Sequence, residues 1–180
     1  MGIDVGELRW LAYHREVSRV SHYRRFTIPK VSGGERLISA PMPRLKAAQH
    51  WILRHLLDPV PVHPAAHGFV KGRSIVTNAR PHVGRRIVVN LDLQDFFPSV
   101  QWIRVDGVFR ALGYSPEVAS TLALLCTELP TVETVLDRIT WHVARGPRAL
   151  PQGSPASPAL TNILCFGLDH RMAGLARALG

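Results

Sequence analysis

Residues 86–93, with the sequence RIVVNLDL, place the strongest constraint on how this chain can fold. Ile87, Val89, Leu91 and Leu93 fall at every second position, and Val88, Asn90 and Asp92 fall between them, the period of two that predicts a β-strand. A carboxylate on a buried strand costs free energy unless a metal ion or a cationic partner compensates it. We therefore predict a strand over residues 86–93 that carries a functional acid, Asp92.

The residues after this strand add a second acid. Asp95 follows Asp92 by three positions, and two phenylalanines and a proline come next in NLDLQDFFPSV. Mg²⁺ prefers oxygen ligands, usually one or two carboxylates together with substrate phosphates. A D-x-x-D pair by itself is more often a helix cap or a solvated turn, but its place at the end of a strand favours a metal site.

Residues 150–162, LPQGSPASPALTN, form a second distinctive segment. Its prolines predict a rigid, extended entry to a helix, and Gln152 projects from a backbone of limited freedom. Such an entry offers backbone N–H groups and a helix N-terminus to an anion or a base pair. The alternative is an ordinary loop ahead of a proline-capped helix.

The charge of the chain is unevenly distributed. Its formal net charge is +9, and residues 1–86 hold 15 Lys and Arg against 5 Asp and Glu, whereas residues 87–180 hold 7 against 8. A basic half suits a polyanion such as nucleic acid, because clustered cations displace phosphate counterions. The alternative is an arginine-rich surface with no such partner.

The remaining periodicities predict an α+β fold. We expect a first helix to about Val20, with Leu8, Leu11 and Ala12 facing inward, and further helices over residues 43–57, 101–112 and 116–128. A last helix is expected over residues 157–179, where the apolar residues form a stripe. Two β-hairpins are expected, one at 23–40 around Ser32-Gly33-Gly34 and one between residues 132 and 150. Cys126 and Cys165 fall in apolar helical patterns, so buried free thiols are expected in preference to a disulfide or a metal site. With no apolar run near the roughly 20 residues of a membrane span, and no basic start typical of a signal peptide, a cytoplasmic protein is expected.

Four motifs together resemble a known family. FTIPKVSGGERLISAP, AAHGFVKGRSIVTNARPH, VVNLDLQDFFPSV and LPQGSPASPALTN occur in an order and spacing that closely resemble retron-type and group II intron-type bacterial reverse transcriptases, over residues 23–180. The resemblance implies the right-hand polymerase fold and template-directed addition of deoxynucleotides with two Mg²⁺ ions. It implies a basic fingers region at 1–86, which includes the hairpin at 23–40, and a partial palm at 87–180. The palm would consist of antiparallel strands backed by helices. It would contain the metal-binding strand 86–93 and the PQG motif 151–153, which is followed by a helix.

The same resemblance implies roles for individual residues. Asp92 matches the first metal-binding aspartate, and Leu93 the residue whose carbonyl also binds metal. Asp95 and Phe96 match residues whose backbone N–H groups meet the triphosphate, and Phe97 matches the steric gate beneath the sugar. Lys30 and Arg36 resemble the cations that clamp the phosphates, and Gln152 and Gly153 the motif that packs on the nucleotide and the templating base. Lys71, Arg73 and Asn162 resemble residues along the template path.

The sequence also departs from the family. Relatives carry a Tyr-x-Asp-Asp hairpin shortly after this point, but Asp-Asp occurs nowhere in the chain, and the thumb is missing. We therefore expect a fragment that is inactive alone, with the missing palm and thumb supplied by the same gene or by a second chain.

The expected partners are an RNA template, a DNA or RNA primer, deoxynucleoside triphosphates and possibly a structured noncoding RNA. Three alternatives remain open: a non-catalytic nucleic-acid-binding remnant, a defence-associated polymerase that needs no template, and a two-metal nuclease built on Asp92 and Asp95. The nuclease lacks a further acidic cluster to complete its site.

Overall fold

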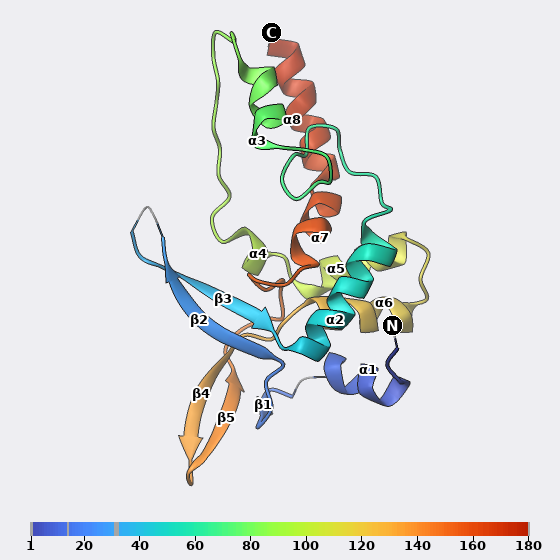
Figure 1. Ribbon diagram of the computed structural model, residues 1–180, viewed down its shortest axis with the longest axis vertical. Coiled ribbons are helices and arrows are strands. Elements are labelled where there is room, and N and C mark those ends of the chain that lie inside the picture. Colours follow the sequence, from blue (N-terminus) through green and yellow to red (C-terminus); the bar gives the residue numbers. More distant parts are fainter. Residues whose placement is uncertain (1, 14, 31–32, 180) are drawn as a thin grey trace.

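The computed structural model describes residues 2–13, 15–30 and 33–179 and has an α+β architecture with antiparallel sheets. In chain order the elements are α1 (Val5–Ala12), β1 (Val17–Ser18), β2 (Tyr23–Pro29), β3 (Glu35–Pro41), α2 (Pro43–Ile52), the π-helical turn η1 (Leu53–Leu57), α3 (Ile75–Ala79), the 3₁₀ turn η2 (Arg80–His82), α4 (Phe96–Ser99), α5 (Trp102–Ala111), α6 (Pro116–Cys126), β4 (Thr131–Leu136), β5 (Ile139–Ala144), α7 (Ser157–Leu164) and α8 (Phe166–Leu179). Figure 1 shows α2, α5, α6 and α7 gathered in the centre, with hairpin β2–β3 on one side, hairpin β4–β5 below, and α3 beside α8 above.

The hairpin predicted over residues 23–40 is confirmed as β2 and β3. The two strands pair antiparallel from Tyr23 opposite Pro41 to Pro29 opposite Glu35. Gly33 and Gly34 have φ of 88° and 79°, a left-handed conformation that glycine adopts without steric cost. The predicted turn residue Ser32 lies outside the described residues.

A second sheet has the strand order β1-β5-β4 and is also antiparallel. Its β4–β5 hairpin confirms the one predicted between residues 132 and 150, and Asp137 and Arg138 form the turn with φ of 51° and 61°. The prediction of a helix to about Val20 is wrong beyond Ala12. Val17 pairs with Val143 of β5 instead, because a long-range backbone ladder there outweighs a weak local helical pattern.

One hydrophobic core lies among the central helices and draws on both sides of residue 86. Both predicted helices after residue 100 are confirmed as α5 and α6, with Gly113 at φ 93° ending the first and Ser115 capping the second. The buried side chains of the core include Leu11, Leu45, Ile52, Val105, Phe109, Leu125, Cys126 and Leu160. The two regions divided at residue 86 therefore share a core.

Asp106 is a buried carboxylate on α5. Its oxygens accept hydrogen bonds from Ser120 Oγ, at 2.8 Å, and from the Arg110 guanidinium one turn along the helix. Desolvation acts to raise the pKa of Asp106, but the hydrogen bonds from Arg110 and Ser120 outweigh it, so the pKa lies below its ordinary value. The charged form thus links α5 to α6.

The predicted strand over residues 86–93 is wrong. Residues 87–93 are extended, but no ladder includes them, and Ile87, Val89 and Leu91 are 74%, 73% and 72% exposed. Figure 1 shows this segment running from the end of η2 down to α4, apart from both sheets. A period-two pattern forms a strand only where a neighbour satisfies its backbone, and the described strands pair only with one another. Asp92 consequently lies in an exposed segment.

The predicted helix over residues 157–179 is interrupted. Helices α7 and α8 meet at Cys165, and the apolar stripe is buried only in its first part, since Leu160 is fully buried whereas Leu168, Met172 and Leu175 are about half exposed. Cys126 and Cys165 are both free thiols; Cys126 is buried as predicted, whereas Cys165 is only partly buried, so that part of the prediction is wrong. Within the described ranges, no helix combines the length and the apolar character needed to cross a membrane.

We predict that Asp106→Asn removes a stabilising charge. Its loss should lower the free energy of unfolding at pH 7 by about 1–2 kcal/mol, measured by urea denaturation. Because the pKa of Asp106 is lowered by folding, this stabilisation is present above the unfolded value of about 3.9 and is lost as pH falls through the folded value. The two proteins should therefore converge in acid.

Glu35→Gln, which removes an exposed carboxylate from β3, is the control and should change stability little at either pH. A gap between wild type and Asp106→Asn that stays constant from pH 7 into acid would contradict this account.

Candidate functional site

The segment 150–162 is where the sequence motifs meet. Ser39 N, at the inner end of β3, donates to Gln152 O at 2.7 Å. Leu150 N donates to Val100 O at 3.0 Å, next to the turn that carries Phe97. Asn162 Nδ2, on α7, donates to Gly68 O at 2.9 Å. One short segment thereby holds the hairpin, the 92–100 motif and the 65–82 motif in fixed relation.

Gly153 allows the closest of these approaches. Its φ is 129°, and a Cβ at this position would lie 2.8 Å from Ser39 O and 3.1 Å from Ile38 Cγ2. Both the backbone conformation and the lack of space exclude a side chain. Gln152 beside it is half-buried. The glycine predicted from the motif is therefore required for contact between the loop and β3.

A buried hydrogen-bond network beneath this loop was missed by the sequence reasoning. Gln49 is fully buried on α2; its Nε2 donates to Leu125 O at 2.8 Å and to Tyr23 Oη at 3.1 Å, and its Oε1 accepts from Ser154 Oγ at 2.9 Å. Burial, together with the Glu128 carboxylate, raises the pKa of Tyr23, so the phenol stays protonated. The sequence signal for this network is Gln49 itself, a polar residue that helical spacing puts on the same inward face of α2 as Leu45 and Ile52.

The two predicted phosphate-clamping cations are exposed and lie on one face of the hairpin. Arg36 is paired with Ile28, and Ile38 with Phe26, and paired residues of antiparallel strands point to the same side. Lys30 follows Ile28 by two positions, and its N–H donates to Gly34 O at 2.9 Å, which continues the ladder. Lys30 and Arg36 thus share the face on which Ile38 meets Gly153.

The predicted metal-binding residues are exposed. In the described part of the chain, Asp92 and Leu93 have no hydrogen-bond partner or ion pair, and no group of three or more His, Cys, Asp or Glu is placed to hold a metal ion. Asp95 has φ 48° and ψ 41°, a left-handed conformation that Asp tolerates, and precedes α4. One carboxylate and one carbonyl fit part of a Mg²⁺ site, which also takes substrate phosphates.

Phe96 and Phe97 follow on α4 and lie against the core. Both are half-buried, with ring centroids 6.3 Å apart and planes at 45°. Val100 N donates to Phe97 O at 3.1 Å, and this turn places Phe97 three residues from the Val100–Leu150 contact. The side chain is thus held by packing but retains an exposed edge.

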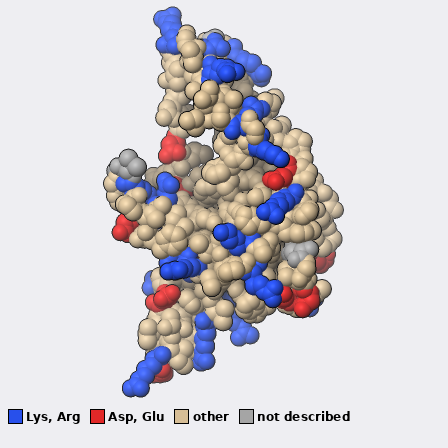
Figure 2. Space-filling view, in the orientation of Figure 1, with Lys and Arg blue, Asp and Glu red and all other residues tan. Residues whose placement is uncertain are grey.

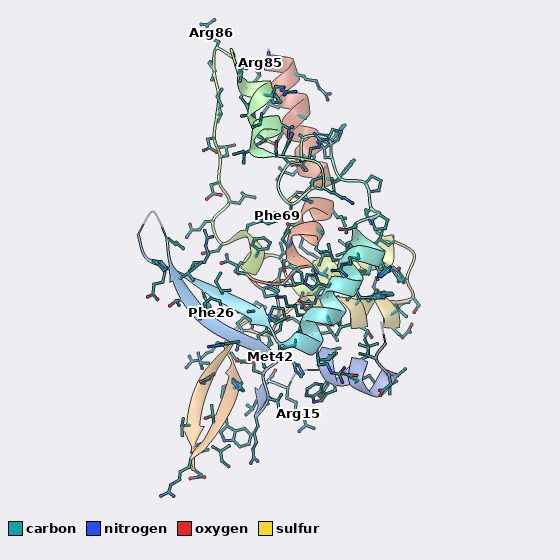
Figure 3. All side chains as sticks on the ribbon, in the orientation of Figure 1. Arg15, Phe26, Met42, Phe69, Arg85 and Arg86 are labelled. Atoms are coloured by element: carbon teal, nitrogen blue, oxygen red, sulfur yellow. The ribbon has the colours of Figure 1, made fainter. Side chains whose placement is uncertain are left out.

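The loop that carries Lys71 and Arg73 lies beside α8, since Arg73 and Arg177 of α8 line one cavity. Both side chains are exposed, and Arg73 Nη1 lies 3.4 Å from His67 Nε2. The same loop holds Phe69 at φ 60° with 82% of its surface exposed, as labelled in Figure 3. An exposed ring on a strained backbone is a feature that the sequence reasoning did not single out.

The structure therefore brings together some predicted site residues and separates others. Gln152 and Gly153 contact β3, whose outer end carries Arg36, and they adjoin the turn that holds Phe97. Asn162 contacts the loop of Lys71 and Arg73 through Gly68. Asp92 and Leu93 stand apart in the extended segment.

Comparison with known proteins gives a consistent result. A family model described as "Reverse transcriptase (RNA-dependent DNA polymerase)" matches residues 28–174. The chain is 52% identical over 180 residues to Retron Mx162 reverse transcriptase of Myxococcus xanthus, a match that covers the whole chain and 37% of that protein. It is 54% identical over 180 residues to Retron Mx65 reverse transcriptase of the same organism, which covers the whole chain and 42% of that protein. It is 37% identical over 180 residues to Retron Ec86 reverse transcriptase of Escherichia coli, covering 99% of the chain and 49% of that protein. The chain thus spans less than half the length of each of these relatives.

We predict that Gly153→Ala loosens the loop from β3. The added methyl group meets Ser39 O and strains the backbone, so the free energy of unfolding should fall by about 1–3 kcal/mol. Hydrogen–deuterium exchange at the Ser39 amide should accelerate, since that N–H donates to Gln152 O.

Gly107→Ala is the matched control. Gly107 lies within α5 with nothing within 4 Å of an added Cβ, so alanine should leave Ser39 exchange unchanged and stabilise the helix by up to about 1 kcal/mol. Equal effects of the two substitutions would show that the Gly153 contact has no special role.

Proposed function

The chain belongs to the reverse transcriptase family, and from this premise we propose that it forms the nucleotide-binding part of a retron-type RNA-directed DNA polymerase. The observation that carries the proposal is the contact of the 150–153 loop with both the hairpin and the turn that holds Phe97. These three motifs are distant in sequence and gather on one side of the core.

Within this proposal the chain forms part of a right-hand polymerase fold. Residues 1–86 constitute a basic fingers region, with β2–β3 as its projecting hairpin, and residues 87–180 constitute a partial palm. The shared core fixes the fingers hairpin relative to α7 and the loop before it. The remaining palm and the thumb lie in residues outside this chain, in the same protein or in a second one, and the complete enzyme works in the cytoplasm.

The incoming deoxynucleoside triphosphate binds between the hairpin and the 92–97 segment. Lys30 and Arg36 bind its phosphates, and the planar guanidinium of Arg36 suits a bidentate contact with phosphate oxygens. The backbone N–H groups of Asp95 and Phe96 meet the same phosphates, while the Phe97 ring lies under the sugar. Support comes from the common face of Lys30 and Arg36 and from the fixed position of Phe97 near Leu150.

Asp92 and the Leu93 carbonyl bind magnesium in this scheme. Two bound Mg²⁺ ions would stabilise both the attacking 3′-oxygen and the leaving pyrophosphate. The exposure of both residues leaves them free to face further carboxylates from outside the chain. The extended backbone of residues 87–93, unpaired among the described residues, is likewise available to complete a sheet.

In this scheme the template strand passes along the side of the 150–153 loop that faces away from the bound phosphates. Gln152 and Gly153 pack against the templating base and its nucleotide, and Asn162, Lys71 and Arg73 line the path of the strand. The partners are an RNA template, a DNA or RNA primer and, in keeping with the names of the relatives, the structured RNA of a retron. The Asn162–Gly68 hydrogen bond supports the grouping of these residues.

Binding of nucleic acid without catalysis is the second candidate. The observation that favours it is the excess of cations over carboxylates in residues 1–86, with Lys71 and Arg73 exposed. This alternative requires affinity for RNA but assigns no role to Asp92 or Phe97. Those two residues therefore discriminate between the candidates.

The polymerase proposal predicts a gain of activity when the chain is completed. The isolated chain should incorporate no deoxynucleotide, because one carboxylate cannot hold two Mg²⁺ ions. A chimera in which it replaces the matching region of Retron Mx162 reverse transcriptase should extend a primer on RNA, and Asp92→Asn should abolish that extension.

Asp137→Asn is the matched control, since Asp137 lies in the β4–β5 turn and Asn tolerates its positive φ. A folded chimera that binds primed template but incorporates nothing, or one that keeps its activity with Asp92→Asn, would refute the assignment.

Phe97→Val should change the choice of sugar in the same chimera. A smaller side chain leaves room for a 2′-hydroxyl, so the ratio of kcat/KM for deoxynucleotide over ribonucleotide should fall by about tenfold or more. Phe166→Val makes the same change on α8 and should leave the ratio unaltered.

Phe97 also packs against the core, so its truncation should cost stability, and a melting curve measures that cost separately. A destabilised Phe97→Val chimera with unchanged sugar preference would identify the ring as packing alone.

A further inference from the structure

A basic cavity lies between residues 63–81 and α8, away from the 150–153 loop. Its volume is about 460 Å³, and it is broadly open to solvent. The side chains that line it include Arg73, Arg80 and Arg177 together with His63 and His67, and no Asp or Glu is among them. The lining thus combines prolines and alanines with side chains that can donate hydrogen bonds to an anion, and it holds no carboxylate.

No carboxylate of the described residues pairs with any of the three arginines. Residues 59–91 contain no Asp or Glu, and within the described ranges Arg73, Arg80 and Arg177 form no ion pair. Elsewhere in the same chain Arg25 pairs with Glu128 at 2.9 Å, and Arg110 pairs with Asp106. Figure 2 shows Lys and Arg spread over the upper part of the molecule, around α3 and α8, with few acidic side chains among them. An anion bound in the cavity would compensate part of this unpaired positive charge.

The cavity is held by contacts on both of its walls. The Asn162–Gly68 hydrogen bond fixes the loop before Arg73, and the His63 ring lies 5.5 Å from Phe166 and 6.1 Å from His170, centroid to centroid. Reciprocal hydrogen bonds between Ser74 and Thr77 then start α3, at whose end Arg80 stands. The three arginines thus line the cavity from three elements, the loop before α3, the turn η2 and the helix α8.

We propose that this cavity binds phosphate groups of a single-stranded polynucleotide. The proposal deepens, and rests on, the proposed function, because it extends the nucleic-acid path beyond Lys71 and Arg73 to Arg80 and Arg177 on the α8 side. Arginine suits the role because its planar fork matches two phosphate oxygens at once.

A strand explains the surroundings better than a free phosphate compound does. The cavity is open to solvent, and exposed cations continue beyond it at Lys71, Arg85 and Arg86, the last two labelled at the top of Figure 3. The exposed ring of Phe69 belongs to the same loop as Lys71, and an aromatic ring beside cations suits unpaired bases. Exposed cations outside the cavity together with an exposed ring suit several phosphates and bases of one strand better than a single phosphate compound.

The test measures binding of a short fluorescein-labelled single-stranded RNA by anisotropy, over a range of salt concentrations. The double variant Arg80→Ala/Arg177→Ala should bind about tenfold more weakly than wild type, and the slope of log K against log salt should fall by about 1.4, the value for two lost phosphate contacts. Arg15→Ala/Arg145→Ala removes two exposed arginines that flank β1 and β5, outside the lining of the cavity, with Arg15 labelled in the lower half of Figure 3, and should change affinity less than about twofold.

Two further measurements make the outcome decisive. Arg80→Lys/Arg177→Lys keeps the charge without the fork, so it should restore the salt slope but only part of the affinity. Circular dichroism melting of each variant confirms that the fold is retained.

The possible failures are distinguishable. If wild type binds RNA and the cavity variant matches the control variant in affinity and slope, the cavity is not part of the path, while the proposed function stands. If wild type binds no RNA, the nucleic-acid partner itself is refuted. Inorganic pyrophosphate binding that is lost in Arg80→Ala/Arg177→Ala, with RNA binding unchanged, would assign the cavity to a free phosphate compound and overturn the proposal.

Discussion

The arrangement of the site depends on one buried carboxamide, that of Gln49. Its nitrogen and oxygen together reach Tyr23 at the start of the hairpin, the last turn of α6 and Ser154 after the PQG motif. An apolar side chain of similar volume would fill the space but leave the Leu125 carbonyl and the Ser154 hydroxyl without these partners, at a cost of about 1–3 kcal/mol for each buried group. A packed core alone would permit small rotations between these elements. The directional bonds of Gln49 set the position of the hairpin relative to the loop.

Features determined by local chemistry could be predicted from the sequence. The turns at Gly33-Gly34 and Gly113 need left-handed backbone that glycine supplies, and Ser115-Pro116 is a typical helix start, so the hairpin, α5 and α6 were predicted close to their observed bounds. The motif around Gln152 and Gly153 was recognised by its order among three others, and the loop contacts β3 as a close-packed glycine requires. These signals lie within a few residues of the structure they specify.

Features set by distant partners could not be predicted in the same way. The alternation over residues 86–93 defines two faces of a strand but does not say whether a neighbouring strand is present, and none of the described strands pairs with it. The short pairing of Val17 with Val143 joins segments more than a hundred residues apart, so local helical spacing gave the wrong result there. Gln49 was overlooked because helical periodicity identifies the inward face of α2 and not what a polar group on that face will contact.

The exposed extended segment also bears on how the chain stays dispersed. IVVNL has high β-propensity, contains no charge or proline, and presents unpaired backbone groups, which together make a segment that tends to add to strands of other chains. Charged residues stand at both of its ends: Arg85 and Arg86 precede it, and Asp92 and Asp95 follow. Such flanking charges oppose the parallel, in-register stacking of identical strands, because each added copy then places Arg beside Arg and Asp beside Asp. The carboxylate of Asp92, proposed above as a metal ligand, would therefore also disfavour that parallel form of self-association.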